Sequence, residues 1–390
     1  MQDNEKKPAL RFKGFTDPWE QRKLGDITVE LSEYATQELG LPLLTSSRSG
    51  LMYQDEYRDS RTTKSTETLF SVVPVGTCTY RHMSDDDVFH MNINTLEKGL
   101  VSREYPVFEA SKGNNLEFLV QHINSSEEFK AFCAEQKKGG TRTRLYYNTL
   151  CQFTVRVPAL KEQAQISQCL KKLDTLITLH QRKHEKLVNI KKSMLDKMFP
   201  QNGVSVPEIR FKGFTDPWEQ RKFSELYEKV SRKNDLTYGK DDIISVANMY
   251  YKAESYITDE NYLLTYNVFE MGDIAFEGNK SKNFAHGRFV ENTIGNGIVS
   301  HVFDVFKPRM TNYDLQFWKY AINNERIMGP ILLRSTKAST MMTNLVADDF
   351  LQENFLIPCY EEQKKIGEFL NQLDTLITLH QRKLEKLQNI

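Results

Sequence analysis

Cysteine and long hydrophobic runs are both scarce in this chain of 390 residues. The five cysteines form no C-x-x-C pair and are odd in number, which argues against a zinc site and against a disulfide framework. The opening residues MQDNEKKPAL hold no apolar signal segment, and no stretch is apolar enough to span a bilayer. We therefore expect a cytoplasmic protein in a reducing compartment.

Net charge is absent as well, because 52 basic residues balance 52 acidic ones. This balance removes the simplest argument for nucleic-acid binding, a strongly basic chain, but it leaves room for local basic patches. The composition is ordinary for a soluble globular protein, and the length predicts two or three domains with their own cores.

Catalytic signatures are missing too. The sequence has no GxxxxGK[ST] phosphate loop, no GxSxG elbow and no HExxH pair. It also lacks the Asn-Pro-Pro-aromatic motif with which adenine methyltransferases hold a flipped base. The acidic run Asp85–Asp87 has no spaced carboxylates and no glycine turn, so a solvated turn is favoured over a metal site. We expect a protein without catalytic, metal or cofactor residues of its own.

What the chain does have is a repeat. Residues 10–23 read LRFKGFTDPWEQRK and residues 209–222 read IRFKGFTDPWEQRK. Residues 173–183 read LDTLITLHQRK, and residues 373–383 repeat them letter for letter. A period of about 200 residues is far longer than a solenoid or propeller unit, so it predicts two whole domains with matching edges.

Between these edges the two copies share only a faint skeleton. GLVSREYPVF at 99–108 matches GIVSHVFDVF at 297–306, and its alternating apolar residues predict a strand. The segments 116–132 and 315–328 predict helices. The near-identical leaders and helices suggest that they bind a common partner. The divergent domains between them suggest that the two domains bind different targets. The alternative, a recent duplication without functional meaning, explains the edges but not why only the middles diverged.

The repeated edges include two long helices. Residues 162–197 contain no glycine or proline, and their apolar residues follow four-three spacing, as they do again after Pro358. We predict an antiparallel coiled coil of the two helices; the alternative is a helix packed on its own domain. His180 and His380 fall on the stripe, where we favour a core position or interhelical hydrogen bonding over metal binding or catalysis. The predicted interface residues are Ile166, Leu170, Leu173, Ile177, His180, Leu187, Ile366, Leu370, Leu373, Ile377, His380, Leu384 and Leu387.

We expect an α+β fold with two similar globular domains, each followed by a long helix. The predicted division is a leader (1–23), a first domain (24–157), a spacer helix (158–200), a linker with the repeated leader (201–222), a second domain (223–357) and a second spacer helix (358–390). The linker assignment rests on Pro200, Gly203 and Pro207. The second helix stops about ten residues short of its internal template, which continues through KKSMLDKMFP.

The ordered set of motifs closely resembles the specificity subunit of type I restriction-modification systems. The set consists of FKGFTDPWEQRK at both leaders, PxxxEQxxI at 158–166 and 358–366, and LDTLITLHQRKxEKLxNI in both helices. The resemblance implies that each domain recognises one half of a bipartite double-stranded DNA target and that the helices set the spacing. It also implies docking of two methyltransferase subunits, restriction subunits recruited through them, and S-adenosylmethionine, Mg and ATP on those partner subunits.

DNA contacts need cations for phosphates and Arg, Lys, Asn, Gln, Ser or Thr for base edges. The basic, hydroxyl-rich GGTRTR at 139–144 is the best candidate, and RSTKAST at 334–340 occupies a similar place in the second copy. A solvated charged loop is the alternative for each. The candidate DNA-binding residues are Arg58, Arg61, Lys64, Arg81, Lys112, Asn114, Thr141, Arg142, Arg144, Asn279, Lys280, Lys282, Arg288, Arg334, Ser335 and Lys337.

Two other classes of function compete with DNA recognition. A scaffold whose duplicated domains bind only proteins would keep its partners and bind no DNA sequence. An enzyme that also methylates or cleaves would transfer methyl groups from S-adenosylmethionine as an isolated chain, and the missing motifs argue against it.

Overall fold

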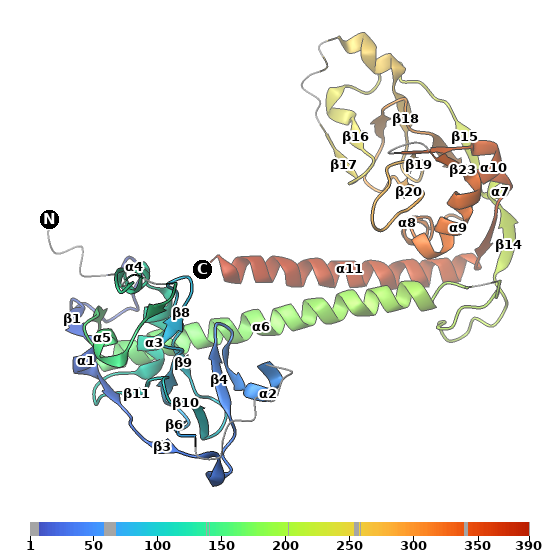
Figure 1. The fold of residues 1–390 in the computed structure, drawn as a ribbon. Helices are drawn as coiled ribbons and strands as arrows, with labels where there is room; N and C mark the ends of the chain where they lie inside the picture. The colour runs from blue at the N-terminus through green and yellow to red at the C-terminus, as the bar shows by residue number, and fades with distance from the viewer. Residues whose placement is uncertain are drawn as a thin grey trace. The chain divides into compact units, whose positions relative to one another are not determined.

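The computed structural model describes residues 8–57, 68–137, 139, 141–201, 203–252, 257, 259–338 and 342–389. The chain divides into two compact units, Met1–Thr175 and Leu176–Ile390. Helix α6 (Leu160–Lys197) passes from the first unit into the second, so the unit boundary falls inside a continuous helix (Figure 1). The six-part division made from the sequence stays a prediction.

The first unit is built on antiparallel sheets. A four-stranded sheet has the order β2-β11-β7-β9 and a three-stranded sheet the order β10-β6-β3, and the ladders β1–β13, β12–β8 and β4–β5 are separate pairs. The strands are β1 (Glu20–Lys23), β2 (Thr28–Glu30), β3 (Tyr34–Ala35), β4 (Leu44–Ser47), β5 (Gly50–Tyr53), β6 (Phe70–Val73), β7 (Cys78–Thr79), β8 (Met83–Ser84), β9 (Asn92–Ile93), β10 (Gly99–Ser102), β11 (Val107–Ala110), β12 (Thr143–Arg144) and β13 (Thr154–Val157).

Short helices close the first unit around an aromatic core. Before α6 they are α1 (Leu24–Ile27), the 3-10 helix η2 (Gln37–Leu39), α2 (Gln54–Tyr57), α3 (Leu116–Ser125), α4 (Glu127–Glu135) and α5 (Tyr147–Leu150). Tyr80, Phe108, Phe118 and Phe129 are buried together in one cluster. Burial of large aromatic side chains is a main stabilising contribution to such a core.

The second unit repeats this plan. Its four-stranded sheet has the order β15-β22-β19-β20, and β14–β25, β16–β17, β18–β21 and β23–β24 are separate antiparallel pairs. The strands are β14 (Glu219–Lys222), β15 (Tyr227–Val230), β16 (Ile244–Ser245), β17 (Tyr250–Tyr251), β18 (Asn267–Phe269), β19 (Ile274–Glu277), β20 (Arg288–Glu291), β21 (Gly297–Val299), β22 (Val305–Pro308), β23 (Thr336–Ala338), β24 (Thr343–Leu345) and β25 (Asn354–Ile357). Sheet and helix content together confirm the predicted α+β class.

The helices of the second unit pack against a core centred on Trp318. Besides the part of α6 from Leu176 onward, they are α7 (Phe223–Leu226), the 3-10 helices η3 (Lys240–Asp242) and η4 (Glu260–Thr265), α8 (Leu315–Ala321), α9 (Glu325–Ser335), α10 (Ala347–Gln352) and α11 (Tyr360–Gln388). Trp318 and Phe317 share this cluster with Ile366 and Leu370 of α11. The start of α11 is therefore fixed to its own domain by apolar packing.

Two predicted elements differ from the observed ones for identifiable reasons. The helix predicted over 116–132 is broken into α3 and α4, because the Ser126 hydroxyl caps α4 by accepting from the Phe129 amide at 3.1 Å. Asn324 breaks the segment 315–328 in the same way before α9. The predicted strand 99–108 is two strands, β10 and β11, joined by a turn in which the Tyr105 amide donates to the Ser102 carbonyl.

Within the second unit, α11 runs antiparallel to the later part of α6. His180 contacts His380, while Lys191, later in α6, pairs with Asp374, earlier in α11. Figure 1 shows the two helices side by side along this stretch. The predicted antiparallel pairing of the long helices is confirmed.

The predicted interface stripe serves two purposes. Ile366, Leu370 and Leu373 are buried in the core of the second domain, so here the alternative of packing on the helix's own domain also holds. Leu170 was predicted at the interface but is 40 % exposed, whereas its counterpart Leu370 is fully buried. The difference arises because Leu370 belongs to the cluster that contains Trp318.

Candidate nucleic-acid interface

The loop at 139–144 places two arginines at the surface of the first domain. Thr143 and Arg144 form β12, whose ladder pairs Thr143 with Ser84 and Arg144 with Met83. The alternation of a strand buries Thr143 and exposes Arg142 and Arg144. Thr141 is exposed as well. Two guanidinium groups and a hydroxyl on a short antiparallel pair suit phosphate and base contacts.

The acidic run Asp85–Asp87 is a bend with Asp85 and Asp86 exposed to solvent, as expected, and its carboxylates also pair with neighbouring side chains. Asp85 accepts from Arg142 Nε at 2.7 Å, Asp86 pairs with Arg48, and Asp87 accepts from the Thr143 hydroxyl. The acidic run thus neutralises cations of the candidate surface. Hydrogen bonds from Ser84 and Arg48 lower the pKa of Asp86 to about 2, so this carboxylate is anionic at neutral pH.

The other candidates of the first domain differ in availability. Arg81 and Lys112 are exposed. Asn114 is half-buried, and its carbonyl accepts from Gln163 Nε2 of α6 at 3.4 Å, which ties it to the start of the helix. Arg58, Arg61 and Lys64 lie outside the described residues.

Sequence reasoning missed the hairpin β4–β5, whose tip carries Arg48. The signal was the segment SSRSG at 46–50, which combines hydroxyls, one cation and a glycine in a tight turn. Ser47 and Gly50 are paired in the ladder, so Arg48 and Ser49 form the two-residue loop. Gly50 has a φ of 123°, a conformation that L side chains rarely adopt.

In the second domain, the segment after β19 carries the exposed residues Asn279, Lys280 and Lys282. Asn279 forms an isolated antiparallel β-bridge with Met342, equivalent to the pairing of Met83 with Arg144 in the first domain. Arg288 behaves differently, because it pairs with Glu277 at 2.7 Å and donates from Nη2 to the Ala247 carbonyl at 2.7 Å. Its guanidinium is used inside the domain.

The predicted match between RSTKAST and GGTRTR is out of register. The Leu145 amide donates to His82 O at 2.8 Å, and its equivalent, the Thr343 amide, donates to Gly278 O at 2.8 Å. By this equivalence, positions 139–144 of the first copy correspond to positions 337–342 of the second. Arg334 and Ser335 therefore correspond to the end of α4, before the loop.

The environments of these residues agree with that shift. Arg334 forms a bidentate pair with Glu353, at 2.8 and 2.5 Å. Ser335 is fully buried and donates its hydroxyl to the Ile331 carbonyl at 2.9 Å, so the prediction that it contacts DNA is wrong. Lys337, on β23, is exposed and keeps its candidate role.

The duplicated leader and the PxxxEQ motif contact each other at two equivalent junctions, one in each copy. Arg11 forms a bidentate pair with Glu162, at 2.6 and 2.7 Å, and Glu162 is buried. Arg210 does the same with the buried Glu362, at 2.7 and 2.8 Å. A bidentate arginine is the geometry that best compensates a buried carboxylate. The leader of each copy is thereby held on the helix that follows its domain.

A second pair of contacts completes each junction. Gln163 and Gln363 donate from Nε2 to the carbonyls of Pro158 and Pro358, at 2.8 and 3.1 Å. The leader strands also pair with the strands that end the domains, β1 with β13 and β14 with β25. The repeated motif residues are therefore used to close each domain.

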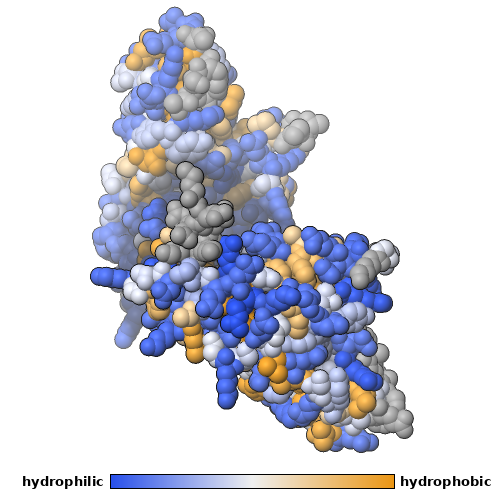
Figure 2. Space-filling view, turned by 90° about the vertical axis from the view of Figure 1, so that its left-hand side faces the viewer, coloured by the Kyte–Doolittle hydropathy of each residue, from blue (hydrophilic) through white to orange (hydrophobic). Residues whose placement is uncertain are grey.

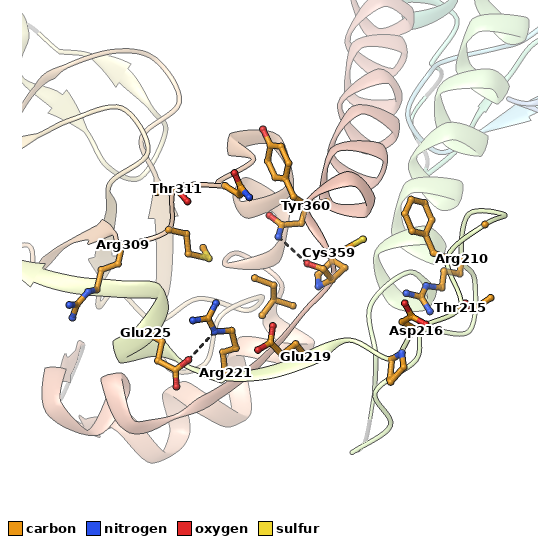
Figure 3. Close-up of a pocket in the computed structure, with 18 residues that line it drawn as sticks. Arg210, Thr215, Asp216, Glu219, Arg221, Glu225, Arg309, Thr311, Cys359 and Tyr360 are labelled. Atoms are coloured by element: carbon orange, nitrogen blue, oxygen red, sulfur yellow. Dashed lines mark hydrogen bonds and ion pairs between the residues drawn. The ribbon is translucent and has the colours of Figure 1, made fainter.

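The junction of the second domain borders a hollow of about 590 Å³ (Figure 3). It lies between the leader, the segment 309–312 and the start of α11. Its lining alternates in charge: Arg221 pairs with Glu225 at 2.9 Å, and Arg309 and Asp216 lie at its edge. An open, mixed-charge lining of this kind is typical of protein contacts rather than of a small-molecule site.

The helix interface contains a polar step where the stripe passes His180. His180 Nδ1 and His380 Nδ1 lie 2.8 Å apart, so of the two expected roles, a core position or an interhelical hydrogen bond, the structure shows the second. Burial, followed by His180 and nearby lysines, lowers the pKa of His380. Lys191, the polar position of the stripe, pairs with Asp374 at 2.5 Å, and Tyr320 donates to the same carboxylate at 2.6 Å.

Among the described residues, no group of three or more His, Cys, Asp or Glu side chains is arranged to hold a metal ion. Nor is any helix in the described ranges long and apolar enough to cross a membrane. On the face drawn in Figure 2, hydrophilic residues dominate and hydrophobic ones occur in small separate groups. Each of the two similar domains carries exposed cations at a polar edge, which is typical of a protein with duplicated recognition domains.

Comparison with known proteins identifies the family. The chain matches the model of the type I restriction modification DNA specificity domain twice, over residues 90–189 and 215–389. These matches cover more than half of the chain, and the chain belongs to this family. Its class is therefore that of a protein built on two type I restriction modification DNA specificity domains.

Two relatives illustrate the match. The chain is 24% identical over 287 residues to the type I restriction enzyme MjaVIII specificity subunit of Methanocaldococcus jannaschii, covering 66% of this chain and 64% of that protein. It resembles the crystal structure of the type I restriction-modification S subunit from M. genitalium with a TM-score of 0.55 and 12% identity. That likeness covers 98% of this chain and 96% of the other, and it shows a common fold.

Proposed function

We propose that this chain is the specificity subunit of a type I restriction-modification complex, in which each domain recognises one half of a bipartite DNA target. The observation that carries the proposal is the contrast within the chain: two like junctions hold two domains whose polar edges differ. In the first domain Arg144 pairs with Met83, and in the second domain the equivalent pair is Met342 with Asn279, so matching places on the two edges carry different side chains. Two different half-sites are the natural target of such a pair.

The helices set the separation of the two half-sites. Helix α6 has 38 residues, which corresponds to about 57 Å at 1.5 Å per residue. Readers one turn of B-DNA apart sit about 34–36 Å centre to centre, so a helix of this length is sufficient for such a spacing. Fixed separation also turns two weak contacts into one strong one through effective concentration.

Catalysis belongs to the partners in this proposal. The chain itself is non-catalytic and takes no cofactor, and it docks two methyltransferase subunits through the helices and the leaders. Those subunits carry S-adenosylmethionine, and restriction subunits recruited through them use Mg and ATP. Support comes from the hollow of about 590 Å³ beside the second leader, whose mixed charges suit a protein partner.

The test is single-molecule methylome sequencing of a host that expresses this chain with a cognate methyltransferase, against a deletion of this chain. We expect a bipartite methyladenine motif with a fixed gap that disappears on deletion. If no motif is found and the purified complex keeps its partners but binds no duplex, the scaffold function replaces DNA recognition. Methyl transfer by the isolated chain would instead support the enzyme alternative.

The spacing role has its own test. One heptad inserted between Thr178 and Lys191 lengthens α6 by about 10 Å, which is about three base pairs of B-DNA. A matched heptad in α11 keeps the interface in register. We expect the gap of the methylated motif to lengthen while both half-sites stay the same. An unchanged gap would contradict the spacing role and leave the recognition role standing.

A further inference from the structure

The first domain contains a polar hollow of about 610 Å³. Of the residues that line it, only Arg81 is among the candidate DNA-binding residues. One side is the tip of the β4–β5 hairpin, with Ser46, Ser47, Arg48 and Ser49. The other side is the segment 81–90, which joins the end of β7 to the start of β9. The hollow adjoins the GTRTR loop, because Asp85, on its lining, pairs with Arg142 of the loop.

The hairpin tip is held rigidly. Asn92 donates from Nδ2 to Ser46 Oγ at 2.7 Å and to the Ser47 carbonyl at 2.8 Å. Ser47 Oγ accepts from the Ser49 amide at 3.1 Å and donates to the Gly50 carbonyl at 2.9 Å. A guanidinium carried on such a turn loses little conformational freedom when it binds a ligand.

Arg48 and Asp86 form an ion pair across the hollow while both remain open to solvent, at 64% and 48% exposure. Ser84 Oγ donates to Asp86 Oδ1 at 2.8 Å and fixes the carboxylate from the other side. The site therefore offers guanidinium donors directly beside a carboxylate acceptor. Both groups are accessible and both are positioned by neighbours.

The carboxylate decides which part of DNA this hollow fits. A site for phosphates alone would not carry two acidic side chains, Asp85 and Asp86, since like charges repel the backbone. A base pair in the major groove presents both kinds of partner. Guanine offers two acceptors to an arginine, and cytosine offers an amino donor to an Asp or Glu carboxylate.

The second domain shows that the same place can be used differently. In the first domain Cys78 pairs with Ile93 across β7 and β9, and in the second Ile274 pairs with Glu291 across the equivalent strands β19 and β20. Cys78 therefore corresponds to Ile274, and Ile93 to Glu291. Arg81 is then equivalent to Glu277, and His90 to Arg288. In the second domain these two residues pair with each other, and Arg288 reaches Ala247 in the equivalent hairpin turn.

We propose that the hollow between the β4–β5 hairpin and residues 81–90 is the base-recognition site of the first domain, in which Arg48 and Asp86 together recognise one G·C pair from the major groove. This site rests on the proposed function and specifies it. On binding, Arg48 exchanges its contact with Asp86 for the guanine edge, and Asp86 accepts from the cytosine amino group.

The test selects duplexes from a randomised DNA library with the full chain and with three variants. Arg48→Ala removes the proposed guanine contact, Arg48→Lys keeps the charge but loses bidentate geometry, and Asp86→Asn removes the anionic acceptor. The matched control is Lys130→Ala, an exposed cation on α4 that is also paired with a carboxylate, Glu127. Unfolding midpoints equal to that of the unmodified chain show that each variant is folded.

We expect all three site variants to lose preference at the same single base pair, by about tenfold to hundredfold, and to keep the other half-site. Arg48→Lys should do so without changing the salt dependence of binding. A uniform loss of binding over all sequences, with a smaller salt slope, would show a phosphate contact and overturn the proposal, and so would an Arg48→Lys variant with unchanged preference. If the unmodified chain selects no sequence, the proposed function itself fails.

Discussion

In the first domain, the space between the hairpin tip and the end of β7 is open and bordered by Arg48, Arg81 and His90. In the second domain, Glu277 and Arg288 stand at the positions of Arg81 and His90 and form an internal ion pair. The positions held by Arg81 and His90 in the first domain are thus held in the second by an acid and a base that pair with each other. An edge that faces solvent in the first domain is therefore held by an internal ion pair, called the brace below, in the second. The two domains share a scaffold and differ in which of its positions remain free for a ligand.

The junctions show the opposite behaviour. Arg11 with Glu162 and Arg210 with Glu362 repeat the same bidentate geometry with distances that agree within 0.1 Å. A buried carboxylate tolerates little change in its partner, so these residues are fixed by the energetics of burial. Residues at the polar edges carry no such penalty and can vary with the target.

The largest expected effect comes from breaking a junction. Arg210→Ala leaves the fully buried Glu362 without its cation, and we expect a loss of about 3–5 kcal/mol in the free energy of unfolding. Arg221→Ala, which removes an exposed pair with Glu225, should cost at most about 1 kcal/mol. Urea denaturation measures both, and equal losses would contradict the structural role of the junction. Arg11→Ala should destabilise in the same direction as Arg210→Ala.

The brace in the second domain gives the next effect. Arg288→Ala leaves Glu277, which is 8% exposed, without its ion-pair partner, and we expect about 1–3 kcal/mol of destabilisation. The equivalent change in the first domain is His90→Ala, which removes no such pair in the described structure and should cost less. Thermal unfolding of the two variants compares them directly. A larger loss for His90→Ala would remove the distinction between brace and open edge.

The loop of the first domain should affect DNA binding without affecting the fold. Arg142→Ala with Arg144→Ala removes two exposed cations, and the salt slope of binding should flatten by about 0.9 for each phosphate that is no longer bound. Fluorescence anisotropy against salt concentration measures this slope. Since Asp85 loses its partner in the double variant, Arg142→Ala with Asp85→Asn serves as the control. An unchanged slope would exclude the loop from the DNA surface.

The smallest expected effect is a pH dependence of the helix interface. Because burial and the nearby His180, His184, Lys183 and Lys383 lower the pKa of His380, the folded chain binds fewer protons than the unfolded one just below pH 6.5. Stability is then fully present above about pH 6.5 and falls as the pH drops from there toward the lowered pKa of His380. His380→Gln should flatten this dependence, and the exposed His301→Gln should not. Unfolding midpoints between about pH 5 and pH 7 decide the matter.

Much of the architecture followed from periodicity and repetition. The long helices and their antiparallel pairing were predicted because an apolar stripe without glycine or proline leaves few alternatives. The same stripe placed His180 and His380 in a core or at the helix interface, without pairing them with each other. Helix breaks at Ser126 and Asn324 were missed, since a single capping residue within an apolar pattern weighs little against the pattern.

The candidate interface was harder to predict. Counting cations selected Arg288 and Arg334, but both are held by carboxylates on neighbouring segments of the fold, Glu277 and Glu353. Ser335 was selected because RSTKAST was matched to GGTRTR in the wrong register. Arg48 was not selected because one arginine among serines is a weak pattern. Which cation stays available depends on tertiary pairing, and a local pattern carries no information about that.

The contact between His180 and His380 joins the same atom of the same residue in two copies of one segment. An antiparallel pair of identical segments that meets at identical atoms has a local two-fold axis through that contact. Leu176 and Leu179 on one helix and Leu376 and Leu379 on the other, all exposed, are related by this axis. Along this stretch a single polypeptide thus presents the self-complementary symmetry of a homodimer.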